Sequence, residues 1–197
     1  VHEHARSQGN LCVRKIRIGG RSDRRRGQGS DETIYKLELL MKKAGVTVED
    51  RAVVAAALAR QAETSAPAAA MELPDGTLVT GRTSDLLGAS SALLLNALKK
   101  IGGLPDDLHM ISPIVLEPIQ NLKTNHLGNR NPRLHTDETL IALSISASTN
   151  PMAKHAMDQL GKLRGCDVHS SVILSQVDER TFKRLGVNLT CEPRYQG

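Results

Sequence analysis

Two amphipathic segments precede residue 67. Residues 32–44 place apolar side chains at helical spacing, and Gly45 follows them directly as a stop signal. Thr47 stands three residues before Asp50, a spacing typical of a capping box, so we expect a second helix to begin there and to run through the alanine-rich residues that follow. The pattern therefore predicts a pair of helices over residues 31–66.

Strand and helix signals alternate from residue 67 onward. Residues 68–73 and 77–81 flank Pro74-Asp75-Gly76, which predicts a β-hairpin. Ser84 is a candidate cap for the next helix. The remaining expected elements are helices over 85–100 and 113–127, a strand over 139–147, a helix over 151–163 capped by Asn150, a strand over 168–175, a short helix capped by Asp178 and ending at Gly186, and a strand over 187–191.

This order of elements predicts the fold class. Strands that alternate with helices across short loops form a sheet with parallel strands, which helices cover on both faces. We therefore expect an α/β fold over residues 67–197, a three-layer α/β sandwich with a β-hairpin and parallel strands, preceded by the two helices of residues 31–66.

The positive charge is confined to the start of the chain. The net charge is +5, yet residues 1–30 alone carry eight Lys and Arg against two acids, so the other 167 residues sum to −1. This Gly-, Arg- and Ser-rich segment lacks apolar periodicity and is interpreted as a disordered basic arm foreign to the fold. A tail for nucleic acid is the alternative, which loss of binding at high salt or on deletion of the arm would reveal.

Composition excludes several classes of protein. Aromatic residues make up only 2% of the 197 residues, which argues against single-strand nucleic-acid modules that stack bases on rings. No apolar run is long enough for a membrane span, and no signal peptide is visible. Three cysteines do not make a disulfide framework, so a cytoplasmic location is expected.

Four segments carry a family resemblance. They are KLELLMKKAGV from Lys36, ELPDGTLVTGRTSDLLGASSALLLNALK from Glu72, NPRLHTDETLIALSISASTNP from Asn131 and HSSVILSQVDERTFKRLGVNLTCEP from His169. With them the chain closely resembles the C-terminal part of the uncharacterised bacterial family called domain of unknown function 1846. The resemblance implies a longer protein whose N-terminal part holds a glycine-rich, phosphate-loop-like segment, and it marks this chain as a fragment.

The element order is also similar to the cytidine-deaminase-like fold. In that fold a Cys/His-x-Glu zinc motif opens the helix after the hairpin, and P-C-x-x-C opens a later helix. This chain has Gly88-Ala89-Ser90-Ser91 at the first place and Pro151-Met152-Ala153-Lys154-His155 at the second. Because such a zinc site needs three strong nitrogen or sulfur ligands, we expect deaminase-like topology with no metal and no cofactor.

One group of polar residues forms a candidate ligand site. Ligands of open α/β sheets bind beyond the carboxyl ends of parallel strands, where helix N-termini attract anions. The candidate ligand-binding residues are Arg82, Thr83, Ser84, Asp85, Arg133, His135, Ser148, Thr149, Asn150, Ser175 and Gln176. Plain helix capping is the alternative explanation, because Ser84 and Asn150 can cap helices without any ligand.

Two hypotheses about function remain open, and neither assigns a catalytic residue. In the first, this is a non-catalytic α/β domain of a larger cytoplasmic protein that serves packing and oligomerisation, with a second copy or the missing N-terminal part as its partner. In the second, it is the ligand-binding part of a hydrolase- or transferase-like enzyme that recognises a phosphate-bearing or nucleotide-like ligand. Neither a membrane nor nucleic acid is an expected partner of the folded part.

Overall fold

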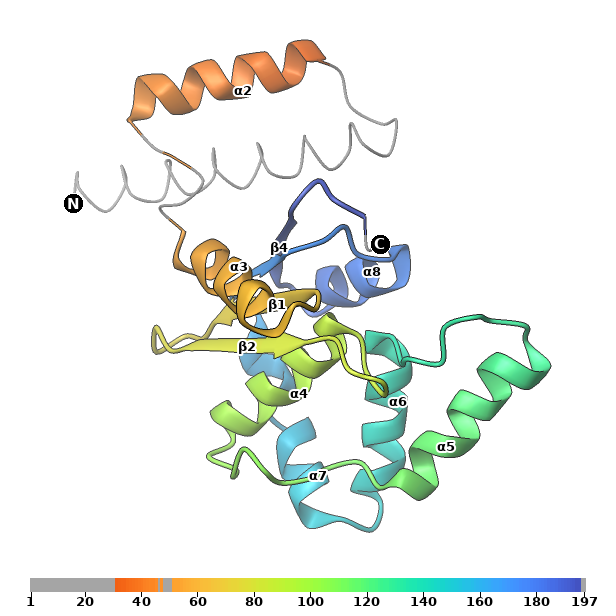
Figure 1. The fold of residues 1–197 in the computed structure, drawn as a ribbon. Helices are drawn as coiled ribbons and strands as arrows, with labels where there is room; N and C mark the ends of the chain where they lie inside the picture. Colours follow the sequence, from red (N-terminus) through yellow and green to blue (C-terminus); the bar gives the residue numbers. More distant parts are fainter. Residues whose placement is uncertain (1–30, 46, 48–50, 196–197) are drawn as a thin grey trace.

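A four-stranded mixed sheet organises the chain (Figure 1). The computed structural model describes residues 31–45, 47 and 51–195, so the basic arm expected at residues 1–30 lies outside the described residues. The strand order is β2-β1-β3-β4, with β1 antiparallel to both β2 and β3, and β3 parallel to β4. The strands are β1 (Ala68–Glu72), β2 (Leu78–Arg82), β3 (Asp167–Ser170) and β4 (Asn188–Cys191).

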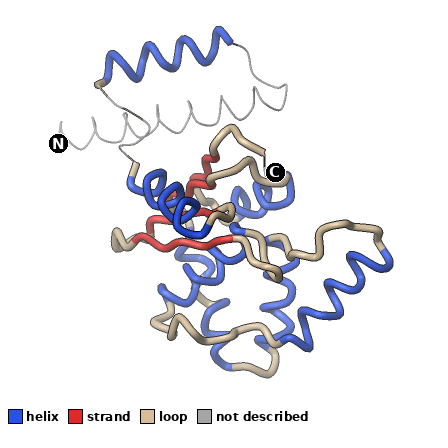
Figure 2. The backbone as a smooth tube through the Cα atoms, in the orientation of Figure 1, coloured by secondary structure: helices blue, strands red, loops and turns tan. Residues whose placement is uncertain are grey.

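Helices supply most of the remaining structure (Figure 2). The α-helices are α2 (Asp31–Ala44), α3 (Ala52–Thr64), α4 (Ala89–Ile101), α5 (Pro113–Asn121), α6 (Thr136–Ala147), α7 (Pro151–Met157) and α8 (Gln176–Arg184). A π-helical turn, η1 (Leu122–His126), continues α5, and a 3-10 turn, η2 (Leu160–Leu163), follows α7. No helix within the described ranges is long and apolar enough to cross a bilayer.

The sheet lies between two layers of helix. On one face Ala70 of β1 packs with Val53 and Ala57 of α3. On the other face Met71 and Val168 join the main core, to which α4, α6, α7 and α8 contribute; in Figure 1 α4, α6 and α7 lie below the sheet and α8 lies beside β4. Alternate residues of a strand point to opposite faces, so β1 contributes to both cores. The predicted α/β sandwich is confirmed, and the finer likeness to the deaminase fold stays a prediction.

Helix α4 lies unusually close to β2. A Cβ atom added to Gly81 of β2 would lie 2.2 Å from the backbone nitrogen of Leu93 in α4, closer than any side chain can approach. The absence of a side chain at Gly81 lets the helix backbone pack directly on the strand. This contact sets the position of α4, and with it the position of the helix's first turn.

The expected strand over residues 139–147 is wrong, because this segment forms most of α6. Its buried positions are Thr136, Thr139, Ala142, Leu143 and Ser146, which follow helical spacing. Polar residues occupy part of that buried face while apolar residues lie on the exposed one, so the apolar residues show no helical period. The sheet therefore has a single parallel pair, β3 with β4.

Three other boundaries differ from expectation. Helix α3 begins at Ala52 rather than at the expected Thr47 cap, and Asp50 lies outside the described residues. Helix α4 begins at Ala89 behind Gly88, so Ser84 does not cap it; Ser84 Oγ instead accepts the Leu87 N–H within the loop. The expected strand over 168–175 ends at Ser170, and the chain then leaves the sheet toward α8.

The N-caps of the last two helices, α7 and α8, agree in part with the prediction from the sequence. Asn150 Oδ1 accepts the Met152 N–H at 2.9 Å and caps α7, as expected for Asn before Pro151. Asp178 does not cap α8, because Ser175 does: Ser175 Oγ accepts the Asp178 N–H at 3.1 Å. This places Asp178 one turn inside the helix, where its carboxylate is available to other groups.

Candidate functional site

A small cavity of about 110 Å³ lies where α4, α6 and α8 begin. Four of the predicted ligand-binding residues line it: Thr83, Arg133, His135 and Ser175. Three helix N-termini meet here because the loops leading into α4, α6 and α8 run side by side. The N-terminal end of a helix carries free N–H groups and a partial positive charge.

The buried carboxylate of Asp178 joins the starts of α6 and α8. Its Oδ1 accepts the backbone N–H of Thr136 at 2.9 Å and the Thr136 hydroxyl at 3.0 Å. Its Oδ2 accepts the Ser175 hydroxyl at 2.7 Å and lies 3.1 Å from His135 Nδ1. Burial alone would raise the pKa of Asp178, but the hydrogen bonds from His135, Thr136 and Ser175 outweigh burial and lower it.

His135 presents one ring nitrogen to Asp178 and keeps the other available. Because ionised Asp178 only accepts hydrogen bonds, His135 Nδ1 must carry the proton between them. The hydrogen bond to Asp178 raises the pKa of His135, although partial burial opposes it. In the described part of the chain no hydrogen bond reaches His135 Nε2, and the residue lines the cavity.

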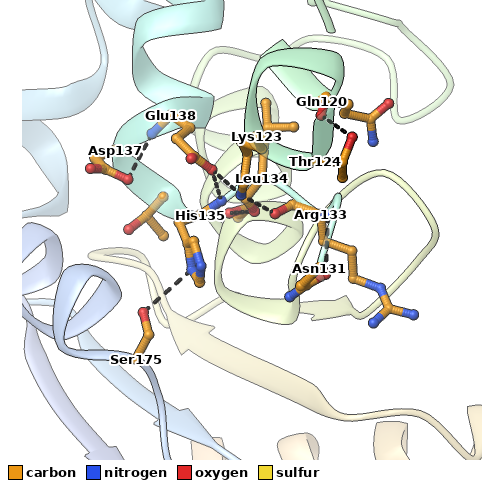
Figure 3. A network of polar contacts seen from close by, with 12 residues as sticks. Gln120, Lys123, Thr124, Asn131, Arg133, Leu134, His135, Asp137, Glu138 and Ser175 are labelled. Atoms are coloured by element: carbon orange, nitrogen blue, oxygen red, sulfur yellow. Dashed lines mark hydrogen bonds and ion pairs between the residues drawn. The ribbon is translucent and has the colours of Figure 1, made fainter. Parts of the chain in front are cut away.

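His135, Asp178 and Ser175 do not form a serine-protease-like triad. Figure 3 shows the imidazole of His135 directed toward Ser175, and Ser175 Oγ lies 3.3 Å from Nδ1. A catalytic triad needs the serine on one ring nitrogen and the carboxylate on the other. Here both contact the same nitrogen, so Ser175 helps to hold the ring rather than serving as a nucleophile.

A second ion pair fixes the loop that carries His135 (Figure 3). Glu138 Oε2 accepts a hydrogen bond from the Lys123 ammonium at 2.6 Å and another from the backbone N–H of His135 at 2.8 Å. Lys123 also donates to the carbonyl of Arg133 at 2.6 Å. The buried Lys123 side chain thus ties η1 to the start of α6, and the backbone of His135 is held on both sides.

Arg133 links the same loop to the loop before α4. Its Nε donates to the carbonyl of Ser84 at 2.6 Å, while Leu134 pairs its backbone with Leu87. Arg133 lines the cavity, and in Figure 3 its guanidinium is turned away from His135. Arg133 therefore holds two walls of the cavity together.

The first turn of α4 has no capping side chain. Gly88 occupies the N-cap position, and Ala89 and Ser90 behind it are buried. Ser90 is only 3% exposed and lines the cavity, yet no hydrogen bond joins its hydroxyl to any described residue. The hydroxyl of Thr83 likewise has no hydrogen bond to any described residue, and Thr83, which is 7% exposed, also lines the cavity. A buried helix start without a cap is uncommon, because its N–H groups then lack partners.

The other predicted residues lie outside the cavity wall. The carbonyl of Ser84 accepts a hydrogen bond from Arg133, but Ser84 itself does not line the cavity. Arg82, Asp85 and Gln176 do not line it either. Ser148, Thr149 and Asn150 follow the C-terminal end of α6, whereas His135 precedes its start. Twelve helical residues span about 18 Å, so the structure does not bring these three to the cavity.

Three contributors are absent from the predicted set. Gly88 and Ser90 are small and uncharged, and in the sequence they stand out only as a place where zinc ligands are missing. Asp178 is expected only as a helix cap, although it contacts His135 across 43 residues of sequence. No local pattern signals that contact. The places compared with the zinc motifs form the first turn of α4 and the start of α7, where His155 Nε2 lies 3.0 Å from the carbonyl of Gly102.

Comparison with known proteins gives one consistent family. The chain is 56% identical over 174 residues to a UPF0371 protein of Corynebacterium efficiens, and 48% identical over 166 residues to one of Streptococcus uberis. The alignments cover 88% and 84% of this chain but only 35% and 34% of those relatives, so the chain spans about a third of their length. Residues 49–197 match the model described as "Domain of unknown function DUF1846, C-terminal". The chain thus belongs to the DUF1846 family, and its residues 49–197 are the C-terminal domain of that family.

Proposed function

We propose that this domain binds an anionic, phosphate-bearing ligand in the cavity where α4, α6 and α8 begin. The buried first turn of α4 carries this proposal, because its N–H groups have no side-chain cap and Ser90 lies among them without a hydrogen-bond partner in the described chain. N–H groups at a helix start bind phosphate and carboxylate groups readily. A bound anion would act as the missing cap.

The charges around the cavity favour an anion. Arg133 and His135 both line the cavity, and His135 gains positive charge when it is protonated. Asp178 is the only carboxylate among the described residues of the wall, and donors from three residues neutralise its effect. The positive ends of three helices add to this field over the short distances at which helix dipoles act.

Differential scanning calorimetry of the full chain, with and without added ligands, tests the proposal. A ligand that binds only the folded state raises the unfolding midpoint, by an amount that grows with its concentration. We expect inorganic phosphate and nucleoside phosphates to raise the midpoint and uncharged nucleosides to leave it unchanged. No rise with any phosphate compound would overturn the proposal.

Removal of one hydroxyl gives a matched pair of variants. Ser90→Ala removes a donor from the cavity and should weaken phosphate binding about fivefold, as expected for one hydrogen bond of about 1 kcal/mol. Ser144→Ala makes the same change on the exposed side of α6 and should leave affinity unchanged. Equal affinities of the two variants would contradict the assignment of Ser90 to the site.

We further infer that this cavity serves as the phosphate-binding part of a hydrolase- or transferase-like enzyme in the longer family members. The fixed His135–Asp178 pair supports this, because an oriented imidazole beside a bound phosphate is a common acid–base arrangement. Phosphatase and phosphotransferase assays would test it on a full-length relative that has histidine at the position of His135, before and after that histidine is replaced by Gln. Turnover that is unaffected by the replacement would exclude this role.

A second candidate function is packing within the longer protein. Ile141 and Ile145 lie one turn apart on α6 and are 58% and 51% exposed, so they form an apolar strip on the outer face of this helix, and such exposed strips often mark contact surfaces. We propose that this face contacts the missing two-thirds of the family protein. Ile145→Lys should change the stability of this chain by less than about 0.5 kcal/mol but lower the melting midpoint of a full-length relative.

The same exposed face of α6 could pair two copies of this chain instead of contacting the rest of a longer protein. If the α6 face instead pairs two copies of this chain, light scattering should show a dimer that Ile145→Lys dissociates. A monomer at all concentrations would exclude oligomerisation through this face and leave the packing proposal in place. The cytoplasmic location expected from the sequence stays a prediction.

A further inference from the structure

We propose that the cavity admits only the terminal phosphoryl group of the ligand, and that His135 binds this dianionic tetrahedral group through a protonated Nε2. This inference rests on the proposed anion-binding function and specifies which part of the ligand the cavity holds. It also assigns His135, rather than Arg133, as the residue that selects a doubly charged group.

The size of the cavity limits the ligand. Its volume is about 110 Å³, whereas pockets for drug-sized molecules measure roughly 300–1,000 Å³. One water molecule takes about 30 Å³ in the liquid, so the space corresponds to about four heavy atoms. A terminal phosphoryl group, which is one phosphorus with three free oxygens, has that size, and its fourth oxygen leads out of the cavity to the rest of the ligand. A nucleoside is larger and must lie outside the cavity.

The hydrogen-bond partners of His135 determine which nitrogen can bind the group. Asp178 and Ser175 both occupy the Nδ1 side of the ring. A second proton therefore has to reside on Nε2, which then becomes a charged donor. Ser90 and Thr83 line the same cavity with hydroxyls that have no hydrogen bond to described residues, so donors approach the space from more than one side.

The charged groups around His135 favour the protonated ring on balance. Asp178 of α8 raises the pKa of His135 most and Glu138 of α6 adds to this effect, while Lys123 of η1 lowers it. Arg133, on the preceding loop, is held away from the ring by its bond to Ser84. The first turn of α4 and the segment before Ser175 bring no charged side chain to the wall. A bound dianion would hold the proton more firmly still.

Binding should therefore become weaker as pH rises. Above the pKa of the free imidazole, each bound dianion takes up one proton, and the dissociation constant should rise about tenfold for each further pH unit. Sulfate is the suitable probe, because its charge is constant across this range whereas phosphate itself titrates. Its dissociation constant can be measured by equilibrium dialysis of radiolabelled sulfate against the full 197-residue chain.

His135→Gln is the central variant. Glutamine keeps a donor but has no titrating group, so sulfate should bind weakly and with no dependence on pH. His126→Gln is the matched control, because His126 is exposed on η1 and does not line the cavity; it should keep the wild-type slope. If His135→Gln fails to fold, the ring-proton NMR signal of His135 in the wild type gives the same information, since its pKa should rise when sulfate is added.

A second pair of probes tests the phosphoryl class. Methyl phosphate presents a dianionic terminal group, whereas dimethyl phosphate has one charge and a second substituent that the cavity would have to hold. We expect methyl phosphate to bind at least tenfold more tightly. Equal affinities would overturn the inference that the cavity takes a terminal group.

The outcomes separate this inference from the proposed function. Sulfate binding with no pH dependence, or with the same slope in His135→Gln, would overturn the role of His135 and leave anion binding intact. Binding of methyl phosphate without binding of sulfate would also overturn it, because a protonated imidazole in an anion pocket must accept both dianions. No binding of any of these anions at any pH would overturn both the inference and the proposed function.

Discussion

Two histidines lie beside carboxylates at similar distances, yet their pKa values shift in opposite directions. His135 Nδ1 lies 3.1 Å from Asp178 Oδ2, and His169 Nε2 lies 3.3 Å from Glu192 Oε1. The bond to Asp178 raises the pKa of His135, whereas burial lowers that of His169 despite the opposing effect of Glu192. The side chain of His135 is 35% exposed and that of His169 is 0% exposed. Access to solvent therefore decides which ring can carry the proton.

The neighbours of His169 strengthen this difference. His169 Nδ1 lies 2.9 Å from Thr190 Oγ1, which also accepts the Arg51 guanidinium at 2.6 Å. The buried charge of Arg51 lowers the pKa of His169 further. His169 thus serves as a neutral, packed residue between the sheet and α3, while His135 lies at the edge of a cavity and can change its charge.

Replacement of Asp178 should have the largest effect on the comparison. Asp178→Ala leaves the buried N–H of Thr136 and the Ser175 hydroxyl without their acceptor, so the free energy of unfolding should fall by about 3 kcal/mol. Urea denaturation measures this change. Asp158→Ala, at an exposed pair with Lys154, is the control and should cost less than about 1 kcal/mol. Similar values for the two variants would mean that Asp178 does not hold the two helix starts together.

Replacement of His169 should rank second. His169→Ala opens a cavity beside the sheet and removes one of the hydrogen-bond partners of Thr190, so we expect the free energy of unfolding, measured by urea denaturation, to fall by about 2–3 kcal/mol. The exposed His126→Ala should change stability by less than about 0.5 kcal/mol. A loss below 1 kcal/mol for His169→Ala would show that the buried ring is replaceable.

Acid should destabilise the protein through His169. Folding lowers the pKa of His169 below the value of about 6.5 that histidine has in an unfolded chain. Below about pH 6.5 the unfolded state therefore binds more protons than the folded state, and the free energy of unfolding decreases as the pH falls. This contribution cannot exceed about 1.4 kcal/mol per pH unit. His169→Gln should flatten the pH profile of stability between about 6.5 and 5, measured by urea midpoints. An unchanged slope would contradict the neutral state of His169.

The effect of His135 on stability should be the smallest and of opposite sign. A pKa raised on folding stabilises the protein fully below about pH 6.5, and this stabilisation disappears as pH rises through the raised value. Because the ring is partly exposed, solvent screening reduces the effect to a few tenths of a kcal/mol. His135→Gln should therefore be slightly less stable than wild type at pH 6 and equal to it at alkaline pH. A gap that widens with pH would reverse the assignment.

The sequence predicted those elements whose signals are local. Pro74-Asp75-Gly76 marks the hairpin, and Asn150 before Pro151 marks the start of α7; both features depend on the conformational preferences of adjacent residues. The prediction of a strand over residues 139–147 failed because Thr139 and Ser146 face the core while Ile141 and Ile145 face outward. Tertiary packing, which apolar periodicity alone does not reveal, decided that Thr139 is buried.

The candidate site was predictable only in part, for a related reason. Thr83, Arg133, His135 and Ser175 follow or precede regular elements, so the general rule for α/β sheets pointed to them. The bond between His135 and Asp178 joins distant loops and depends on how α6 and α8 pack. The error over 139–147 also placed Ser148 at the wrong end of an element, since a strand and a helix send the chain in different directions.

Gly81 shows that the geometry of the cavity depends on a residue that does not line it. The strand–helix contact at Gly81 leaves no room for a methyl group, so alanine there would have to displace the backbone of α4. The start of α4 would move with it, while His135 is held by α6 and α8. The edge strand β2 thereby sets the spacing between the hydrogen-bond donors of the proposed anion site. A substitution of Gly81 should therefore weaken binding of the proposed anion although every residue that lines the cavity is unchanged.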